Sequence, residues 1–313
     1  MATGVTTYND LTPAVREAYK RKLLERAMQD QVYMQFADEA MIDANNGDKV
    51  LYRRYDPYPI VTTPITDGVV NAPRKPTYSQ PSAELDYYGD YTKITKRTVK
   101  TNLEQVTGEV MDIHGQQAGE TIDALMREVL YSGASYLNCS NGTTGGVPSS
   151  ISFKDFESAT KLLRKASAKK ISPMIEGTNK FGTTPVNNSY YCFFHTDLRD
   201  DIRSLDQFVS VEKYASTKGA LPTEFGMVDD VRLIETNVGK EVDGVYSNFI
   251  VGANSHTAVK LSGENLSMYR HGFGSAGTED PHNMFMTIGW DIAWTGLVTN
   301  DLWMMDLRCI HTA

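Results

Sequence analysis

Apolar side chains recur with helical spacing over residues 103–131 and predict the longest helix of the chain there. The apolar stripe consists of Val106, Val110, Ile113, Ile122, Leu125 and Val129. Three glycines in the same segment, Gly108, Gly115 and Gly119, remove bulk and let another element approach closely. The pattern therefore predicts a central spine helix that packs against a body.

A second helical pattern covers residues 12–36, where Thr12 precedes a proline at the first helical position. Its apolar positions, spaced by four or five residues, are Val15, Tyr19, Leu23, Ala27 and Val32. The polar turn residues 43–48 then separate this helix from the next segment. We expect an N-terminal arm that docks on the body.

Residues 49–100 hold six of the twelve prolines and seven of the seventeen tyrosines, but no Phe, Trp, Met or Cys. Such a stretch cannot build a core of its own. Residues 49–55 and 87–95 are rich in β-branched and aromatic types and predict the two limbs of a hairpin, with residues 57–81 as its irregular tip.

The hairpin is too long to lie on its own body. About 24 residues drawn out as a strand reach roughly 80 Å, whereas a globule of about 210 residues has a radius of gyration near 17 Å. An isolated two-stranded ribbon is marginal in water, so the ribbon is expected to lie on a neighbouring copy of the same protein.

The rest of the chain predicts a mixed α and β unit. Ser152 with Asp155 forms a capping signature for a helix to about Lys169. Strand patterns cover residues 190–195, 231–236 and 246–251, and a short helix is expected over 197–205. Residues 284–309 contain all three tryptophans and are expected to form strands buried against the spine helix.

Charge is distributed unevenly along the 313 residues, whose net charge is −8. Residues 49–100 carry nine basic and five acidic side chains, and residues 101–313 carry 17 basic and 26 acidic ones. We interpret this as complementarity between the arm of one copy and the body of the next, the alternative being a solvated charged hairpin. An acidic body argues against extensive nucleic-acid binding.

Composition also limits the location of the protein. No apolar run approaches the ~20 residues that a membrane span needs, and the first residues lack the pattern of a signal peptide. Cys139, Cys192 and Cys309 are odd in number and widely spaced, which predicts reduced structural thiols in a cytoplasm.

Residues 272–277 match the glycine-rich dinucleotide fingerprint, which works only between a strand and a helix. The acidic residues Glu279 and Asp280 and the following Pro281 oppose both a helix start and phosphate binding. We therefore expect a flexible loop, with a nucleotide-dependent enzyme as the alternative reading.

The six histidines show no metal-ligand spacing. His195 could meet Asp197, and His271 could meet Asp280 and His282, in each case as an ordinary polar contact. No nucleophile elbow, P-loop or Cys-His signature is present. The sequence thus predicts no catalytic, cofactor-binding or metal-ligating residue, no cofactor, and a protein that is not an enzyme.

The order of arm, extended loop, spine helix and mixed domain resembles the major capsid protein of tailed bacteriophages. Shorter segments resemble the phage N4-like major capsid family, and the likeness extends from about Leu11 to the C-terminus. These segments are residues 51–55 (LYRRY), 63–69 (TPITDGV), 88–91 (YGDY), 224–226 (EFG), 231–236 (VRLIET) and 274–281 (GSAGTEDP).

The resemblance implies the Hong Kong 97-type capsid fold, an α+β architecture. Its implied parts are an N-terminal arm with a helix over residues 1–48, an extended β-hairpin loop over 49–100, a peripheral domain with the spine helix over 101–189, an axial domain over 190–261, and a return to the peripheral domain over 262–313. Some relatives form Lys–Asn crosslinks between subunits. Lys75 and Asn71 are available types near the loop tip, but no crosslink is predicted.

The implied function is that of a structural major capsid protein. Pentamers and hexamers would self-assemble in the host bacterial cytoplasm into the icosahedral head of a virion around double-stranded DNA, without sequence-specific contact. Portal, scaffold and cement proteins are possible further partners, and no membrane is involved. The alternative is the shell subunit of an encapsulin-like nanocompartment.

Overall fold

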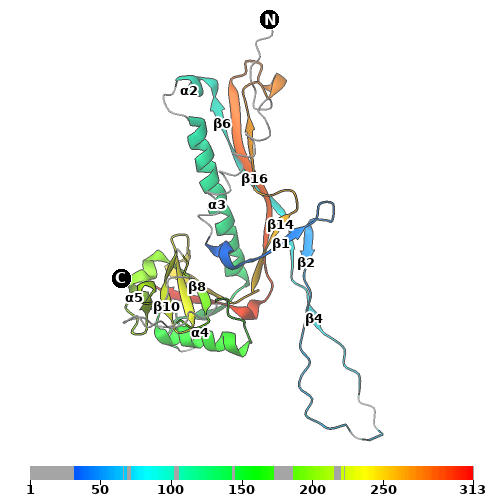
Figure 1. Cartoon of the computed structure of the whole chain (residues 1–313), viewed down its shortest axis with the longest axis vertical. Coiled ribbons are helices and arrows are strands. Elements are labelled where there is room, and N and C mark those ends of the chain that lie inside the picture. Colours follow the sequence, from blue (N-terminus) through cyan, green and yellow to red (C-terminus); the bar gives the residue numbers. More distant parts are fainter. Residues whose placement is uncertain are drawn as a thin grey trace.

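The computed structural model describes residues 32–65, 67, 68, 72–101, 106–142, 145–172, 186–214, 220, 221 and 223–312. The helix expected over residues 12–36 lies outside this part except for its end, which is a 3-10 helix, η2 (Tyr33–Phe36). Figure 1 shows an elongated molecule with a long helix and sheet at one end, a second sheet at the other, and a separate arm.

The first sheet has five strands. They are β1 (Asp38–Ile42), β6 (Asp86–Thr95), β14 (His256–Leu261), β15 (Ser267–His271) and β16 (Phe285–Val298). The long strand β16 is central: it pairs antiparallel with β6 along one side and with β14 and β15 along the other, while β1 pairs parallel with β14.

The spine helix α3 (Val106–Gly133) covers one face of this sheet (Figure 1). The helix was predicted correctly, but its packing face only in part: of the predicted stripe Ile122 is buried, whereas Ile113 is 63% exposed. Met126 and Leu130 of the helix share a buried core with Trp290 and Trp294 of β16. The helix ends at Gly133, where an added Cβ would lie 2.5 Å from a methyl carbon of Val298. Close approach therefore requires glycine at this position.

The predicted role of the spine glycines holds only in part. Gly115 and Gly119 are buried, but a Cβ added at Gly108 would meet nothing within 4 Å. A short helix, α2 (Lys96–Thr101), precedes the spine.

The second sheet has eight strands. They are β7 (Ser135–Asn138), β8 (Tyr190–His195), β9 (Val209–Ser210), β10 (Glu224–Val228), β11 (Val231–Thr236), β12 (Lys240–Val242), β13 (Val245–Val251) and β17 (Met304–Ile310). The order is β7-β17-β13-β8-β11-β10-β9, with β12 also paired to β13. Two helices accompany this sheet, α4 (Phe153–Lys165) and α5 (Arg199–Arg203), with the 3-10 turns η3 (Thr196–Leu198) and η4 (Val211–Lys213).

The capping box of α4 is confirmed. The Asp155 carboxylate accepts hydrogen bonds from the Ser152 backbone N–H at 3.0 Å and from its hydroxyl at 2.6 Å. The same carboxylate also accepts the N–H groups of Ser140 and Gly142, which ties the preceding loop to the helix start. The helix ends at Lys165, four residues before the predicted end at Lys169.

Residues 284–309 do not all return to the spine helix, so this prediction is wrong for the last strand. β16 lies under α3, but the chain then passes through η6 (Asp301–Trp303) and enters the eight-stranded sheet as β17, between β13 and β7. β14, in contrast, lies in the five-stranded sheet. β14 precedes residue 261 but belongs to the sheet below α3, and β17 follows residue 261 but belongs to the other sheet. A single division at residue 261 therefore does not separate the two sheets, because their strands pair over long sequence separations.

The arm begins as two short ribbons, β2 (Lys49–Leu51) with β5 (Ser82–Glu84), and β3 (Arg54–Tyr55) with β4 (Tyr78–Ser79). The predicted hairpin partner of residues 49–55 was therefore wrong. The segment 87–95 lies in β6 and pairs with β16, where Ile94 is buried against the core below α3.

The 3-10 turn η5 (Gly277–Glu279) lies between β15 and β16.

Candidate assembly surface

The base of the arm is an ordered ribbon. The N–H of Tyr52 donates to the carbonyl of Pro81 at 3.0 Å, and the N–H of Asp56 donates to the carbonyl of Thr77 at 3.0 Å. The Tyr78 ring lies 4.8 Å from the guanidinium carbon of Arg53. These contacts hold residues 49–56 against residues 77–84.

One arginine fastens this ribbon to the body. Arg54 donates from Nη1 to Oδ1 of Asn300 at 2.5 Å, and its Nη2 lies 3.7 Å from a carboxylate oxygen of Asp301. The contact joins the arm to the turn between β16 and β17. The direction of the arm relative to the body is therefore set at its base.

Beyond the ribbon, every described residue between 56 and 77 is exposed. Ile60 is 89% exposed and Ile65 is 77% exposed. Figure 1 shows this loop projecting away from both sheets. Covering such apolar side chains with another surface lowers the free energy, so these residues are available for a contact.

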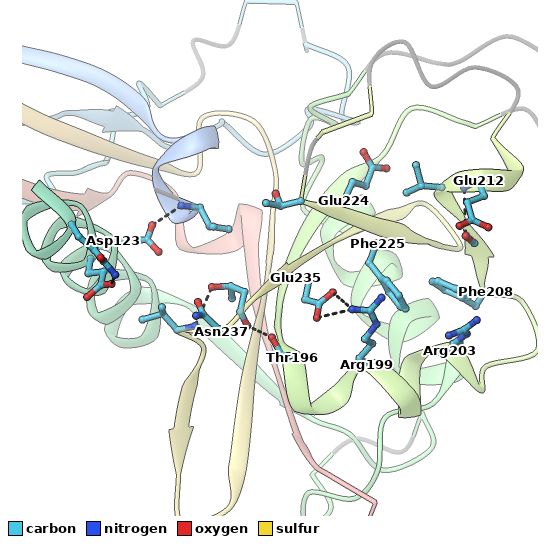
Figure 2. A pocket seen from close by; sticks show the side chains of 18 residues that line it. Asp123, Thr196, Arg199, Arg203, Phe208, Glu212, Glu224, Phe225, Glu235 and Asn237 are labelled. Carbon is cyan, nitrogen blue, oxygen red and sulfur yellow. Dashed lines mark hydrogen bonds and ion pairs between the residues drawn. The ribbon is translucent and has the colours of Figure 1, made fainter. Parts of the chain in front are cut away.

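A cavity of about 790 Å³ lies between α3 and the eight-stranded sheet (Figure 2). It was not foreseen from the sequence. Five carboxylates and two guanidinium groups line it: Glu120, Asp123, Glu212, Glu224, Glu235, Arg199 and Arg203.

The carboxylate of Asp123 on α3 binds the backbone at residues Val32 and Tyr33. Its Oδ1 accepts the backbone N–H of Val32 at 2.9 Å and that of Tyr33 at 2.7 Å, while Oδ2 has no hydrogen-bond partner. Burial raises the pKa of the Asp123 carboxyl to about 6, although these backbone N–H groups and Arg127 oppose the shift.

Tyr33 itself is anchored in the core, where the centroid of its ring lies 4.9 Å from that of Phe193.

Two acids on the opposite wall, Glu235 and Glu224, already have partners. Both carboxylate oxygens of Glu235 accept from Nη1 of Arg199, at 3.2 and 3.1 Å, and the Arg199 guanidinium lies over the Phe225 ring. Glu224 accepts the Tyr214 hydroxyl at 2.9 Å. Figure 2 shows Asp123 on one side of the cavity and the Arg199–Glu235 pair on the other.

Asp123 carried one sequence signal that was missed. It follows Gly115 and Gly119 at intervals of four, so all three residues share one face of the spine helix. The two glycines are buried, and the η2 turn packs against α3. A carboxylate on a face of close approach needs backbone donors, which the entering chain supplies.

One predicted histidine contact is present, and the other is present only in part. Nδ1 of His195 lies 3.3 Å from the Asp197 carboxylate, which also accepts the Tyr246 hydroxyl, as expected for an ordinary polar contact. Asp280 instead folds onto its own loop and accepts the Phe285 N–H at 2.8 Å. Backbone donors of this loop lower the pKa of the Asp280 carboxyl, and His282 makes a smaller contribution in the same direction, so His282 does lie near Asp280. Among the described residues, no ion pair joins Asp280 to His271.

The glycine-rich residues 272–277 form a turn that leads only into the three-residue η5, so the segment is a loop and lacks the helix that the dinucleotide fingerprint needs. Within the described part of the chain, no group of three or more His, Cys, Asp or Glu residues is placed to hold a metal ion. No described helix combines the length and apolarity that a membrane crossing needs.

Comparison with solved structures identifies the architecture. The chain is similar to a capsid protein of the cyanophage P-SCSP1u, with 9% identity, a TM-score of 0.63, and coverage of 90% of this chain and 89% of that one. It is also similar to the capsid of Ralstonia phage GP4, with 11% identity, a TM-score of 0.61, and coverage of 91% and 92%. The fold is the Hong Kong 97-type capsid fold.

The same fold relates the chain to an encapsulin. The encapsulin complex of Synechococcus elongatus matches with 12% identity and a TM-score of 0.53, over 94% of this chain and 90% of that one. No family model matches the sequence, and no curated protein matches it. At these identities the likeness establishes the Hong Kong 97-type fold alone.

Proposed function

We propose that this chain is the subunit of an icosahedral phage head, assembled from pentamers and hexamers around double-stranded DNA. The observation that carries the proposal is the loop between residues 56 and 77, whose described apolar side chains Ile60, Val61 and Ile65 are 89%, 64% and 77% exposed. Its fold, shared with phage capsid proteins, supports the same conclusion. The sequence segments quoted above support assignment to the N4-like family.

The proposed mechanism is association rather than catalysis. The ribbon, fixed to the body by Arg54, carries its apolar tip across a subunit boundary, and the apolar area buried there supplies most of the free energy of assembly. We assign α3 and the five-stranded sheet to the peripheral part of each subunit. We assign the eight-stranded sheet with α5 to the axial part, which differs from the expected ranges in taking β7 from residues 101–189 and β17 from residues 262–313.

Portal, scaffold and cement proteins belong to the proposed head as further partners, and assembly would occur in the cytoplasm of the host bacterium. A second candidate is the shell of a nanocompartment that encloses cargo proteins. The similarity to the encapsulin chain over nearly its whole length favours this reading. The two candidates share the shell and differ in its contents.

Expression of the chain in bacteria, followed by sedimentation and electron microscopy, tests the shell. We expect closed shells or capsomer rings, and a uniform population of 34.8 kDa monomers at high concentration would refute the proposal. Particles purified from infected cells then separate the candidates. Nuclease-resistant double-stranded DNA inside them identifies a phage head, and a stoichiometric protein cargo without DNA identifies a compartment.

A further inference from the structure

The three cysteines are far apart in the sequence but share one core in the fold. Cys139 follows β7, Cys192 lies in β8 and Cys309 lies in β17, and all three are fully buried between the eight-stranded sheet and α4. We propose that a small disulfide oxidant converts Cys139 and Cys309 of the folded chain into a disulfide, while Cys192 stays a free thiol. This modification site belongs to the single folded chain and does not depend on the proposed shell function.

The register of β7 and β17 places the two thiols side by side. The parallel ladder of these strands ends with Asn138 opposite Arg308. The N–H of Cys139 then donates to the carbonyl of Arg308 at 2.8 Å, so Cys139 and Cys309 are the next pair in the same register. Neighbouring strands lie about 4.8 Å apart, which is within the Cα separation of about 4.4–6.8 Å that a disulfide spans.

The two side chains also lie on the same face of the sheet. Side chains alternate along a strand, so Cys139 shares a face with Leu137, and Cys309 shares a face with Leu307. All four belong to the buried core against α4. A hydrogen bond with the Cys309 thiol, together with burial, raises the pKa of the Cys139 thiol. The two thiols are thus already neighbours in the reduced chain.

The order of the strands sets Cys192 apart from this pair. Because β13 lies between β8 and β17, residues of β8 are two strand spacings, about 10 Å, from those of β17. Through Ile250 of β13, Cys192 is level with Met305 of β17, and Cys309 lies four residues further along that strand. Cysteines whose Cα atoms are more than about 7 Å apart cannot be bridged without backbone movement. The fold therefore selects one pairing.

Both thiols of the pair lie where the sheet can open. β7 is an edge strand whose ladder with β17 stops just before Cys139, and Ile310, the residue after Cys309, is 40% exposed. Strand ends of this kind open locally at a lower free-energy cost than the whole fold. Local opening gives an oxidant access to thiols that are buried in the closed sheet.

The chemistry is thiol–disulfide exchange with a small disulfide such as oxidised glutathione. The thiolate of one cysteine attacks the S–S bond of the oxidant, forms a mixed disulfide and releases one thiol. The thiolate of the second cysteine then attacks the cysteine sulfur of the mixed disulfide and releases the other thiol. Two protons and two electrons pass from the cysteines to the two released thiols, which balances the reaction.

The bond would join two passages of the chain between the sheets. β7 follows α3 directly, and β17 follows β16 through η6. A covalent link between β7 and β17 therefore ties together the two segments that enter the eight-stranded sheet from α3 and from β16. It also closes a long loop, from residue 139 to residue 309, which restricts the unfolded chain.

Alkylation and mass spectrometry test the pairing. The full chain is incubated in its folded state with oxidised glutathione, then unfolded in urea and alkylated at every remaining free thiol. We expect one alkyl group in place of the three that the untreated chain takes up, and a disulfide-linked peptide pair that contains Cys139 and Cys309. The same oxidation of a chain already unfolded in urea should give all three pairings, because only the fold selects one.

Single variants separate the roles of the three thiols. After oxidation, Cys139→Ala and Cys309→Ala should each keep two free thiols, whereas the matched control Cys192→Ala should keep none. The oxidised unmodified chain should melt about 5 °C or more above the reduced chain, and Cys309→Ala should show no such rise.

Three free thiols after oxidation of the folded chain, glutathione that stays attached, or a bond that includes Cys192 would each overturn the inference. A Cys139–Cys309 bond that leaves the melting temperature unchanged would overturn its proposed restriction of the chain. None of these measurements requires a shell, so the inference and the proposed function can fail separately.

Discussion

Substitution of Ile60 by alanine separates assembly from folding. Ile60 is 89% exposed in the single chain, so its side chain contributes almost nothing to the core. Removing it is expected to change the free energy of unfolding by no more than about 0.5 kcal/mol, as for other surface sites. If a neighbouring subunit covers Ile60, the alanine variant removes about three buried carbon groups from the contact between the two subunits.

The loss follows from the size of the side chain. At about 0.8 kcal/mol for each buried carbon group, the alanine variant loses roughly 2.4 kcal/mol at each subunit contact. This corresponds to about a 50-fold rise in the concentration at which shells appear, since 1.4 kcal/mol is a factor of ten. Sedimentation velocity over a concentration series measures that threshold, and urea unfolding of unassembled chains measures the stability.

Val147→Ala is the matched control, because Val147 is 85% exposed but lies in the loop between β7 and α4. We expect both the threshold and the stability of this variant to equal those of the unmodified chain. The reasoning is refuted if Ile60→Ala assembles at the unmodified threshold. It is also refuted if Ile60→Ala lowers the free energy of unfolding by more than 1 kcal/mol, since the loop would then pack on its own chain.

Three further predictions concern the body. Asp123→Ala leaves the N–H groups of Val32 and Tyr33 without their acceptor and should cost about 2–4 kcal/mol of stability; amide exchange at Tyr33 should accelerate, and unchanged exchange would contradict this pair of hydrogen bonds. Burial raises the pKa of Asp306 from 3.8 to about 6, so the folded state takes up this proton first as the pH falls. The group therefore adds about 1 kcal/mol of stability between pH 7 and pH 5; Asp306→Asn should remove that gain in urea unfolding, and an unaltered pH dependence would argue against the shift. Gly289→Val should destabilise the chain by about 1–3 kcal/mol in the same assay, because an added Cβ would lie 2.7 Å from the carbonyl oxygen of Asp90, and a neutral result would exclude this close approach.

Local patterns predicted the local elements correctly. The stripe from Val106 to Val129 gave the spine helix, and Ser152 with Asp155 gave the start of α4, because both signals lie within a few turns of one segment. The loop tip was also predicted, since its prolines and its lack of large core residues are properties of the segment itself.

Pairing between distant segments was not predictable in the same way. The β-branched and aromatic residues of the segment 87–95 predict a strand, but they do not choose between residues 49–55 and β16 as its partner. The sheets to which β14 and β17 belong could not be predicted for the same reason, because their partner strands are distant in the sequence. The cavity was missed because its walls come from α3, α5 and β10, which meet only in the folded chain.

A cryo-electron microscopy reconstruction of the assembled particle tests the central claim most directly. The account predicts that density for residues 56–77 crosses a subunit boundary and covers Ile60 and Ile65 with a neighbouring subunit. Density that folds this segment back onto its own subunit, or leaves it in solvent between well-resolved subunits, would contradict the account.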